Sequence, residues 1–150
     1  LGNCIVEIED HADLLPLKHK KDHILTALPD SLKEAIRCFV LSRAIRLLRG
    51  HAGKHMSMLI NVSRFTNVQT HQVRPLVYDY IEQLRNSVDT AQPGEGHDPI
   101  YDALKSSWRL RRFDEAEPDW ANVQTKLRDS AFPKVVSVNS GSTDRNTPVE

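Results

Sequence analysis

The run from Ser31 to Gly50 has the pattern of one amphipathic helix. Ser31 and Glu34 have the spacing of a capping box, and Gly50 supplies a C-terminal stop, so a helix is predicted over 32–49. Arg37 projects onto the apolar side and needs a partner if it is buried. The apolar side comprises Ile36, Val40, Leu41, Ala44, Leu47 and Leu48.

Hydrophobic periodicity along the rest of the chain predicts further helices and three short strands. The strands are predicted at 3–8, 56–62 and 134–140, and the helices at 68–87, 100–110 and 118–131. Strands separated by helical crossovers predict an α/β fold with parallel pairing. The 56–62 strand is expected at the centre of the sheet because it is apolar on both faces.

The length of 150 residues suits one domain, predicted over 1–140, followed by a polar flexible tail at 141–150. The chain starts with Leu1 rather than Met and ends just after a predicted strand, so we expect a fragment of a larger protein. No stretch of 18 apolar residues indicates a membrane span. Two cysteines make no disulfide framework, which fits a reducing cytoplasm.

Charge excludes a uniformly basic coat, because 20 Lys and Arg balance 20 Asp and Glu. Any nucleic-acid binding must therefore come from a local patch. Three arginines share the polar side of the 32–49 helix, and a dipeptide at 63–64 follows the predicted central strand, where ligands gather in α/β sheets. The predicted nucleic-acid-binding residues are Arg43, Arg46, Arg49, His55, Ser63 and Arg64. The alternative is a solvated helix face with ordinary ion pairs.

No catalytic constellation is visible in the sequence, and no metal site is predicted. The segment 50–55 has two glycines and a lysine, as a phosphate loop does, but the spacing differs and His55 replaces the required Ser or Thr. Two histidine pairs, His19 with His23 and His51 with His55, lack the further ligands that a zinc site needs. We therefore expect no cofactor in this chain.

Two blocks of the sequence resemble a known family. They are LPDSLKEAIRCFVLSRAIRLLRG at 28–50 and HMSMLINVSRFTNVQ at 55–69, and KVVSVNS at 134–140 fits a later strand of the same family. The chain resembles the Z-one domain family of candidate endonucleases over roughly 22–140. Members of that family lie in large bacterial proteins with helicase-like ATPase modules, often near restriction and phage-defence genes.

The resemblance implies a partial RecA-like parallel sheet with flanking helices, placed around the second lobe of the parent protein. It implies a role in DNA binding or in coupling to the ATPase module of the same parent chain, with ATP and Mg²⁺ used by that parent. Two alternatives stay open. One is a metal-dependent endonuclease domain with an unrecognised site, and the other is a purely structural interdomain module whose basic face docks on a neighbouring domain.

Overall fold

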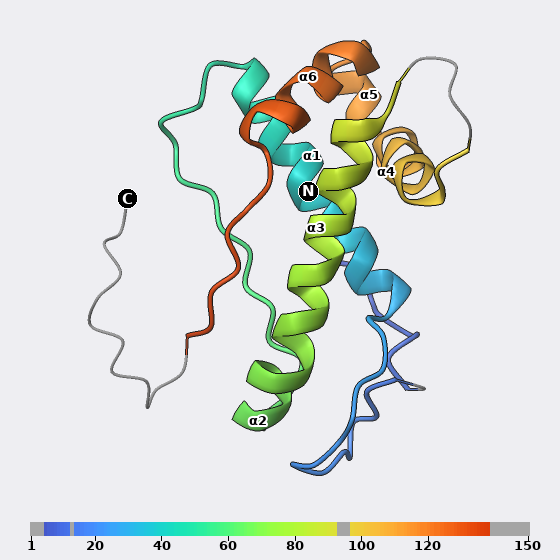
Figure 1. Cartoon of the computed structure of the whole chain (residues 1–150), viewed down its shortest axis with the longest axis vertical. Helices are drawn as coiled ribbons and strands as arrows, with labels where there is room; N and C mark the ends of the chain where they lie inside the picture. The colour runs from blue at the N-terminus through green and yellow to red at the C-terminus, as the bar shows by residue number, and fades with distance from the viewer. Residues whose placement is uncertain (1–4, 13, 93–96, 139–150) are drawn as a thin grey trace.

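The computed structural model describes residues 5–12, 14–92 and 97–138, and this part of the chain is built from helices (Figure 1). Four long helices carry the fold, and three short helical segments connect them. In chain order they are α1 (Asp30–Leu48), α2 (Thr66–Val68), the π-helix η1 (Gln69–Val73), α3 (Arg74–Thr90), α4 (Pro99–Leu110), α5 (Phe113–Ala116) and α6 (Trp120–Ser130).

The predicted α/β fold with a RecA-like parallel sheet is wrong for the described residues, none of which lies in a strand. The segments 5–8, 56–62 and 134–138 contain no helix and run along the outside of the helices (Figure 1). Alternating apolar residues indicate an extended chain, but a sheet also needs a second backbone at hydrogen-bonding distance. The remaining residues of the predicted end strands and the predicted tail at 141–150 lie outside the described residues.

The core lies where α1, α3, α4 and α6 meet. The helix α1 contacts α4, α5 and α6, and α3 contacts α4 and α6. The side chains at the centre are aliphatic and have no exposed surface, and burial of each Val or Leu side chain among them stabilises the fold by roughly 1.5–3 kcal/mol. They are Val40, Leu41 and Ala44 of α1, Leu84 and Val88 of α3, Leu104 of α4, and Val123 and Leu127 of α6.

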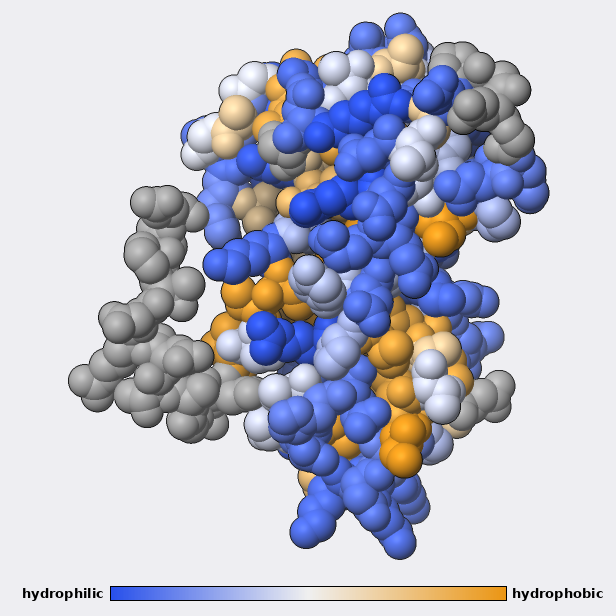
Figure 2. All heavy atoms as spheres, viewed as in Figure 1, coloured by the Kyte–Doolittle hydropathy of each residue, from blue (hydrophilic) through white to orange (hydrophobic). Residues whose placement is uncertain are grey.

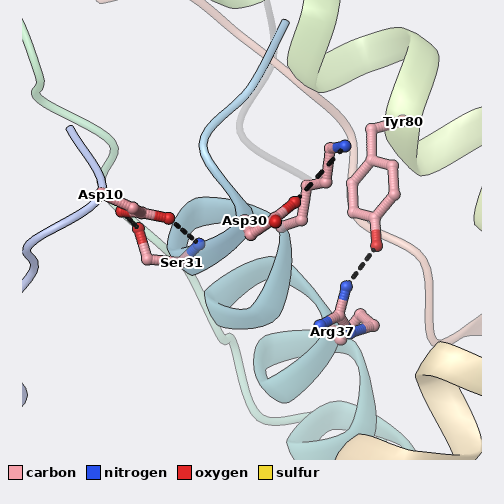
Figure 3. A network of polar contacts seen from close by, with 6 residues as sticks. Asp10, Asp30, Ser31, Arg37 and Tyr80 are labelled. Carbon is pink, nitrogen blue, oxygen red and sulfur yellow. Dashed lines mark hydrogen bonds and ion pairs between the residues drawn. The ribbon is translucent and has the colours of Figure 1, made fainter. Parts of the chain in front are cut away.

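The helix predicted at 32–49 is confirmed as α1, but its start differs from the capping-box prediction. Asp10 takes the place of the box: its carboxylate accepts hydrogen bonds from the Ser31 amide at 2.8 Å and the Ser31 hydroxyl at 2.6 Å (Figure 3). Glu34 points elsewhere and pairs with Arg111 at 2.7 Å. Gly50 ends the helix as expected, with a φ of 76° that a residue with a Cβ adopts only under strain.

Arg37 is the polar residue on the apolar side of α1, and it has the partners that its position requires. Its Nε donates to the Ser107 hydroxyl and one Nη donates to the Tyr80 hydroxyl, both at 2.8 Å (Figure 3). Ser107 is 2% exposed and Tyr80 is 8% exposed, so both bonds are shielded from water. These two hydrogen bonds connect α1 to α3 and α4, so the polar side chain of Arg37 links three helices.

The predicted helix at 68–87 is confirmed, with an interruption at its start. The π-helix η1 leads directly into α3, whose second residue is Pro75. Proline has no amide hydrogen to donate, so the α-helical hydrogen bond from residue 75 cannot form. The π-helix η1, with its wider turn, ends at this point. Both glutamines of η1 hold extended backbone: Gln69 Nε2 donates to the Ile60 carbonyl at 3.2 Å, and Gln72 Oε1 accepts from the Leu25 amide at 3.3 Å.

The last two long helices are confirmed with small changes at their starts. The Asp98 carboxylate caps α4 by accepting from the amides of Ile100 and Tyr101. The Asp119 carboxylate caps α6 by accepting from the Ala121 amide, so Pro118 lies just before the helix rather than in its first turn. In the described part of the chain, no helix combines the length and the apolar character needed to cross a bilayer.

Candidate nucleic-acid interface

The middle of the chain carries a local excess of positive charge although the whole sequence is neutral. No Asp or Glu stands between Glu34 and Asp79, whereas seven Lys and Arg do. This stretch contains all six residues predicted to bind nucleic acid. The structure divides those six between opposite ends of the molecule and gives two of them partners within the fold.

Arg43 is occupied by its own chain. Its guanidinium donates to the carbonyl oxygens of Lys54 at 3.0 Å and Ala52 at 3.3 Å. These bonds hold the loop that follows α1 against the helix. Because the loop turns two carbonyls toward an arginine, it differs from a phosphate loop, which presents amide hydrogens to its ligand.

The other basic residues near the C-terminal end of α1 form a surface cluster. Arg46 is half-buried and the rest are exposed, and within the described residues none has a hydrogen bond or an ion pair from its side chain. We call them the α1-end cluster, comprising Arg46, Arg49, His51, Lys54 and His55. Arg46 lies in the last turn of α1 and Arg49 at its C-cap, so the negative pole of the helix dipole stabilises the positive charge of both side chains.

A cavity of about 360 Å³ lies beside the α1-end cluster. Phe39, Met56 and Phe132 form its apolar wall, and Arg43, Lys54 and His55 form its basic side. The cavity is open to solvent through the exposed loop at 51–55. An anionic group with a flat apolar part would match both walls.

Ser63 and Arg64 lie far from the α1-end cluster. Figure 1 shows the chain after α1 running the length of the molecule before it enters α2, and the pair directly precedes that helix. Ser63 is 8% exposed and accepts a hydrogen bond from the Phe65 amide at 3.1 Å. The six predicted residues therefore do not lie in one patch.

The Ser63 hydroxyl also meets His19, a contact that the sequence did not suggest. His19 Nδ1 donates to the Pro16 carbonyl at 2.7 Å, which leaves Nε2 of the neutral ring to accept from Ser63 Oγ at 2.7 Å. A nucleophilic serine is likewise hydrogen-bonded to a histidine that a third group orients. Here the Ser63 hydroxyl is buried and also accepts a hydrogen bond from the Phe65 amide. The His19–Ser63 hydrogen bond therefore holds the 18–23 loop against the backbone before α2.

That fastening creates a second basic cluster. Lys18, Lys20 and Lys21 are exposed on the loop, and the Lys21 carbonyl accepts from Asn67 Nδ2 at 3.2 Å. Arg64 is exposed beside this contact, with its guanidinium 4.8 Å from the centre of the Phe65 ring. Figure 2 shows many hydrophilic side chains at this end of the molecule, with some hydrophobic surface beside them. The run KHKKDH was visible in the sequence, but its position next to Arg64 depends on the fold.

Several other arginines are neutralised within the fold. Arg111 pairs with Glu34, and this bond holds the pKa of the Glu34 carboxyl below its ordinary value. Arg112 pairs with Glu115. The hydrogen bonds from Ser31 likewise hold the pKa of the Asp10 carboxyl below its ordinary value. These pairs make Arg111 and Arg112 a natural reference for arginines without a partner.

Neither histidine pair makes a metal site. The rings of His19 and His23 lie 5.5 Å apart, and His23 Nε2 donates to the Leu14 carbonyl at 2.7 Å. His51 and His55 lie on the exposed loop rather than on one helix face. Across the described ranges, no group of three or more His, Cys, Asp or Glu side chains is placed to hold a metal ion.

In a comparison with protein families, the model of the Z1 domain matches residues 31–147. The chain belongs to the Z1 domain family. The resemblance inferred from the blocks at 28–50 and 55–69 is thereby confirmed. No curated protein and no solved structure matches the chain at a significant level.

The Z1 match contains the α1-end cluster and Ser63 with Arg64, but it excludes the 18–23 loop. The two basic clusters therefore differ in their position relative to the Z1 match. The α1-end cluster lies wholly within the match, whereas the second cluster combines Arg64, inside the match, with lysines that precede it.

Proposed function

We propose that this Z1 domain binds DNA through the phosphates, with the α1-end cluster as the contact surface. The observation that carries the proposal is a group of five basic or imidazole side chains without partners among the described residues, on a stretch of sequence that has no acid. An ion pair with a carboxylate of the same chain would neutralise these charges, as Glu34 and Glu115 do for Arg111 and Arg112. Unpaired charges stay available to an external anion.

The arrangement suits phosphates in two respects. Arg46 and Arg49 present planar forks that match phosphate oxygens, and they lie three residues apart on one helix face. Lys54 and His55 come from a loop whose backbone Arg43 holds in place, so less conformational freedom is lost on binding. Arg43 is thus proposed to position the surface rather than to touch the DNA.

Within the parent protein we propose that this surface couples DNA to a helicase-like ATPase module. ATP and Mg²⁺ would bind to that module, since the loop after α1 lacks the geometry of a phosphate loop. We place the function in the cytoplasm, in keeping with two cysteines and no disulfide framework. An endonuclease activity of this chain is not part of the proposal.

The test is a fluorescence-anisotropy titration of labelled duplex DNA at several salt concentrations. If Arg46, Arg49 and Lys54 touch phosphates, the slope of log affinity against log salt is about −3, at about −0.9 per contact. The double variant Arg46→Gln/Arg49→Gln should flatten the slope by about two contacts and weaken binding to all sequences alike.

The matched control is Arg111→Gln/Arg112→Gln, which removes two arginines that already have carboxylate partners. It should leave the slope near that of the parent chain. Equal slopes for the parent and for a folded Arg46→Gln/Arg49→Gln variant would refute the proposal and favour a structural basic face.

A further inference from the structure

The side chains of the segment 56–62 alternate between the core and solvent. Met58 and Ile60 pack against the core, whereas Leu59 between them is 87% exposed. This period of two is the mark of an extended chain with one face on the protein and one face in solvent. An apolar side chain as exposed as Leu59 contributes nothing to the folded core.

The backbone of this segment has one edge turned inward and one edge turned outward. The Ile60 carbonyl accepts from Gln69 Nε2, so the edge that includes Ile60 faces η1. In an extended chain the polar backbone groups of neighbouring residues point to opposite sides. The outward edge therefore carries the amides and carbonyls of Ser57, Leu59 and Asn61. None of these groups is hydrogen-bonded to another described residue.

We propose that 56–62 accepts an extended strand from a partner protein, which pairs with the outward edge of the segment. Unpaired backbone donors and acceptors in an extended chain are completed best by another extended backbone. The exposed Leu59 calls for an apolar residue opposite it. Because Lys54 and His55 precede the segment, Arg64 follows it and the surrounding stretch has no acid, the partner strand carries Asp or Glu at both ends.

A neighbouring segment extends the apolar part of this surface. The 134–138 segment starts beside the same cavity as Met56, and its Val136 and Val138 are 60% and 88% exposed. Figure 1 shows the two segments on the same side of the helices, and Figure 2 shows hydrophobic surface there. A docked strand would cover side chains that the fold itself leaves in water.

The probe is the blocked, fluorescently labelled peptide Glu-Val-Thr-Val-Thr-Val-Glu, titrated with the whole chain and followed by anisotropy. Two related peptides separate the contributions. One has alternate amides N-methylated on the edge that pairs, which removes backbone donors and keeps the side chains. The other has Lys in place of both Glu residues. We expect the N-methylated peptide to bind at least tenfold more weakly, and the Lys peptide several-fold more weakly at low salt.

Variants of the chain test which edge is used. Asn61→Pro removes one outward amide and suits an extended backbone, whereas Asn61→Ala removes only the side chain. The proline variant should lose about tenfold in affinity, with its helical circular dichroism unchanged, and the alanine variant should bind like the parent. The Arg46→Gln/Arg49→Gln variant should also bind like the parent, which separates this surface from the proposed DNA site.

Three outcomes would overturn the proposal. The first is that the acid-ended peptide fails to bind at millimolar concentration. The second is that the N-methylated peptide binds as well as its parent, because adhesion of side chains alone would then explain the signal. The third is that a folded Asn61→Pro chain keeps full affinity.

Discussion

The helical core and the extended segment 56–62 are both apolar, yet they differ in how their backbones are satisfied. In α1 and α3 the backbone is helical, and the helices bury Leu41 and Leu84 completely. In 56–62, Met58 and Ile60 reach the core, and the side chain of Gln69 donates a hydrogen bond to the Ile60 carbonyl. Hydrophobicity alone therefore does not distinguish a segment that builds the core from one that lies on it.

This difference assigns separate roles to the two regions. The helices hold the fold together and fix the direction in which the basic residues point. The extended segment adds Met58 and Ile60 to the edge of the core and keeps backbone groups available on its outer edge.

Truncation of a core side chain should cost far more than truncation of an exposed one on the extended segment. Leu41→Ala leaves a cavity between α1 and its neighbours and should lower the free energy of unfolding by about 2–5 kcal/mol. Leu59→Ala removes a side chain that is 87% exposed and should stay within about 0.5 kcal/mol of the parent. Urea unfolding followed by circular dichroism measures both. Similar losses for the two variants would contradict this division of roles.

The polar cross-link inside the core should give a smaller loss. Arg37→Met leaves the hydroxyls of Ser107 and Tyr80 without their buried donor, and we expect a loss of about 1–3 kcal/mol. Arg46→Met serves as the control because Arg46 has no partner among the described residues, and its effect should be within about 0.5 kcal/mol. If both variants unfold at the same urea concentration, the Arg37 contacts do not support the core.

The smallest effect is a pH dependence from Glu34. The bond from Arg111 holds the folded-state pKa of Glu34 below its unfolded value of about 4.3, so the carboxylate stabilises the folded chain above that pH. The benefit disappears as the pH falls through the lower, folded-state pKa. We expect Glu34→Gln to be less stable than the parent at pH 6 and the gap to shrink at acidic pH, as measured by urea unfolding.

Glu9→Gln is the control for the Glu34 prediction, since Glu9 is exposed and has no partner among the described residues. Its stability relative to the parent should change little over the same pH range. A gap for Glu34→Gln that stays constant with pH would show that its ion pair with Arg111 does not contribute.

The sequence was sufficient for the long helices because their signals are local. The apolar period of α1, its stop at Gly50 and the need of Arg37 for a partner were all readable from spacing. The start of α1 was not, because its cap is Asp10, which is separated from Ser31 along the chain and joined to it only by folding. The sheet was predicted wrongly because strand pairing depends on distant backbones, and alternation at 56–62 reports only an extended chain.

The candidate site was predictable in composition but not in arrangement. Among the described residues, the side chains of Arg46, Arg49 and His55 have no hydrogen bond or ion pair, and their role in binding stays a prediction. Arg43 turned inward because loop carbonyls lie within its reach, which no spacing rule indicates. Ser63 was placed at a strand end by a fold that does not form, and its actual partner is His19.

Residue-resolved hydrogen exchange of the isolated chain, measured by nuclear magnetic resonance, tests whether the outward edge of 56–62 is unpaired. We predict strong protection for the interior amides of α1 and α3 and almost none for those of Ser57, Leu59 and Asn61. Addition of the acid-ended peptide should protect these three amides and leave the helices as they were. Protection of 56–62 equal to that of α1 in the free chain would show that the segment is already paired, and would contradict the account.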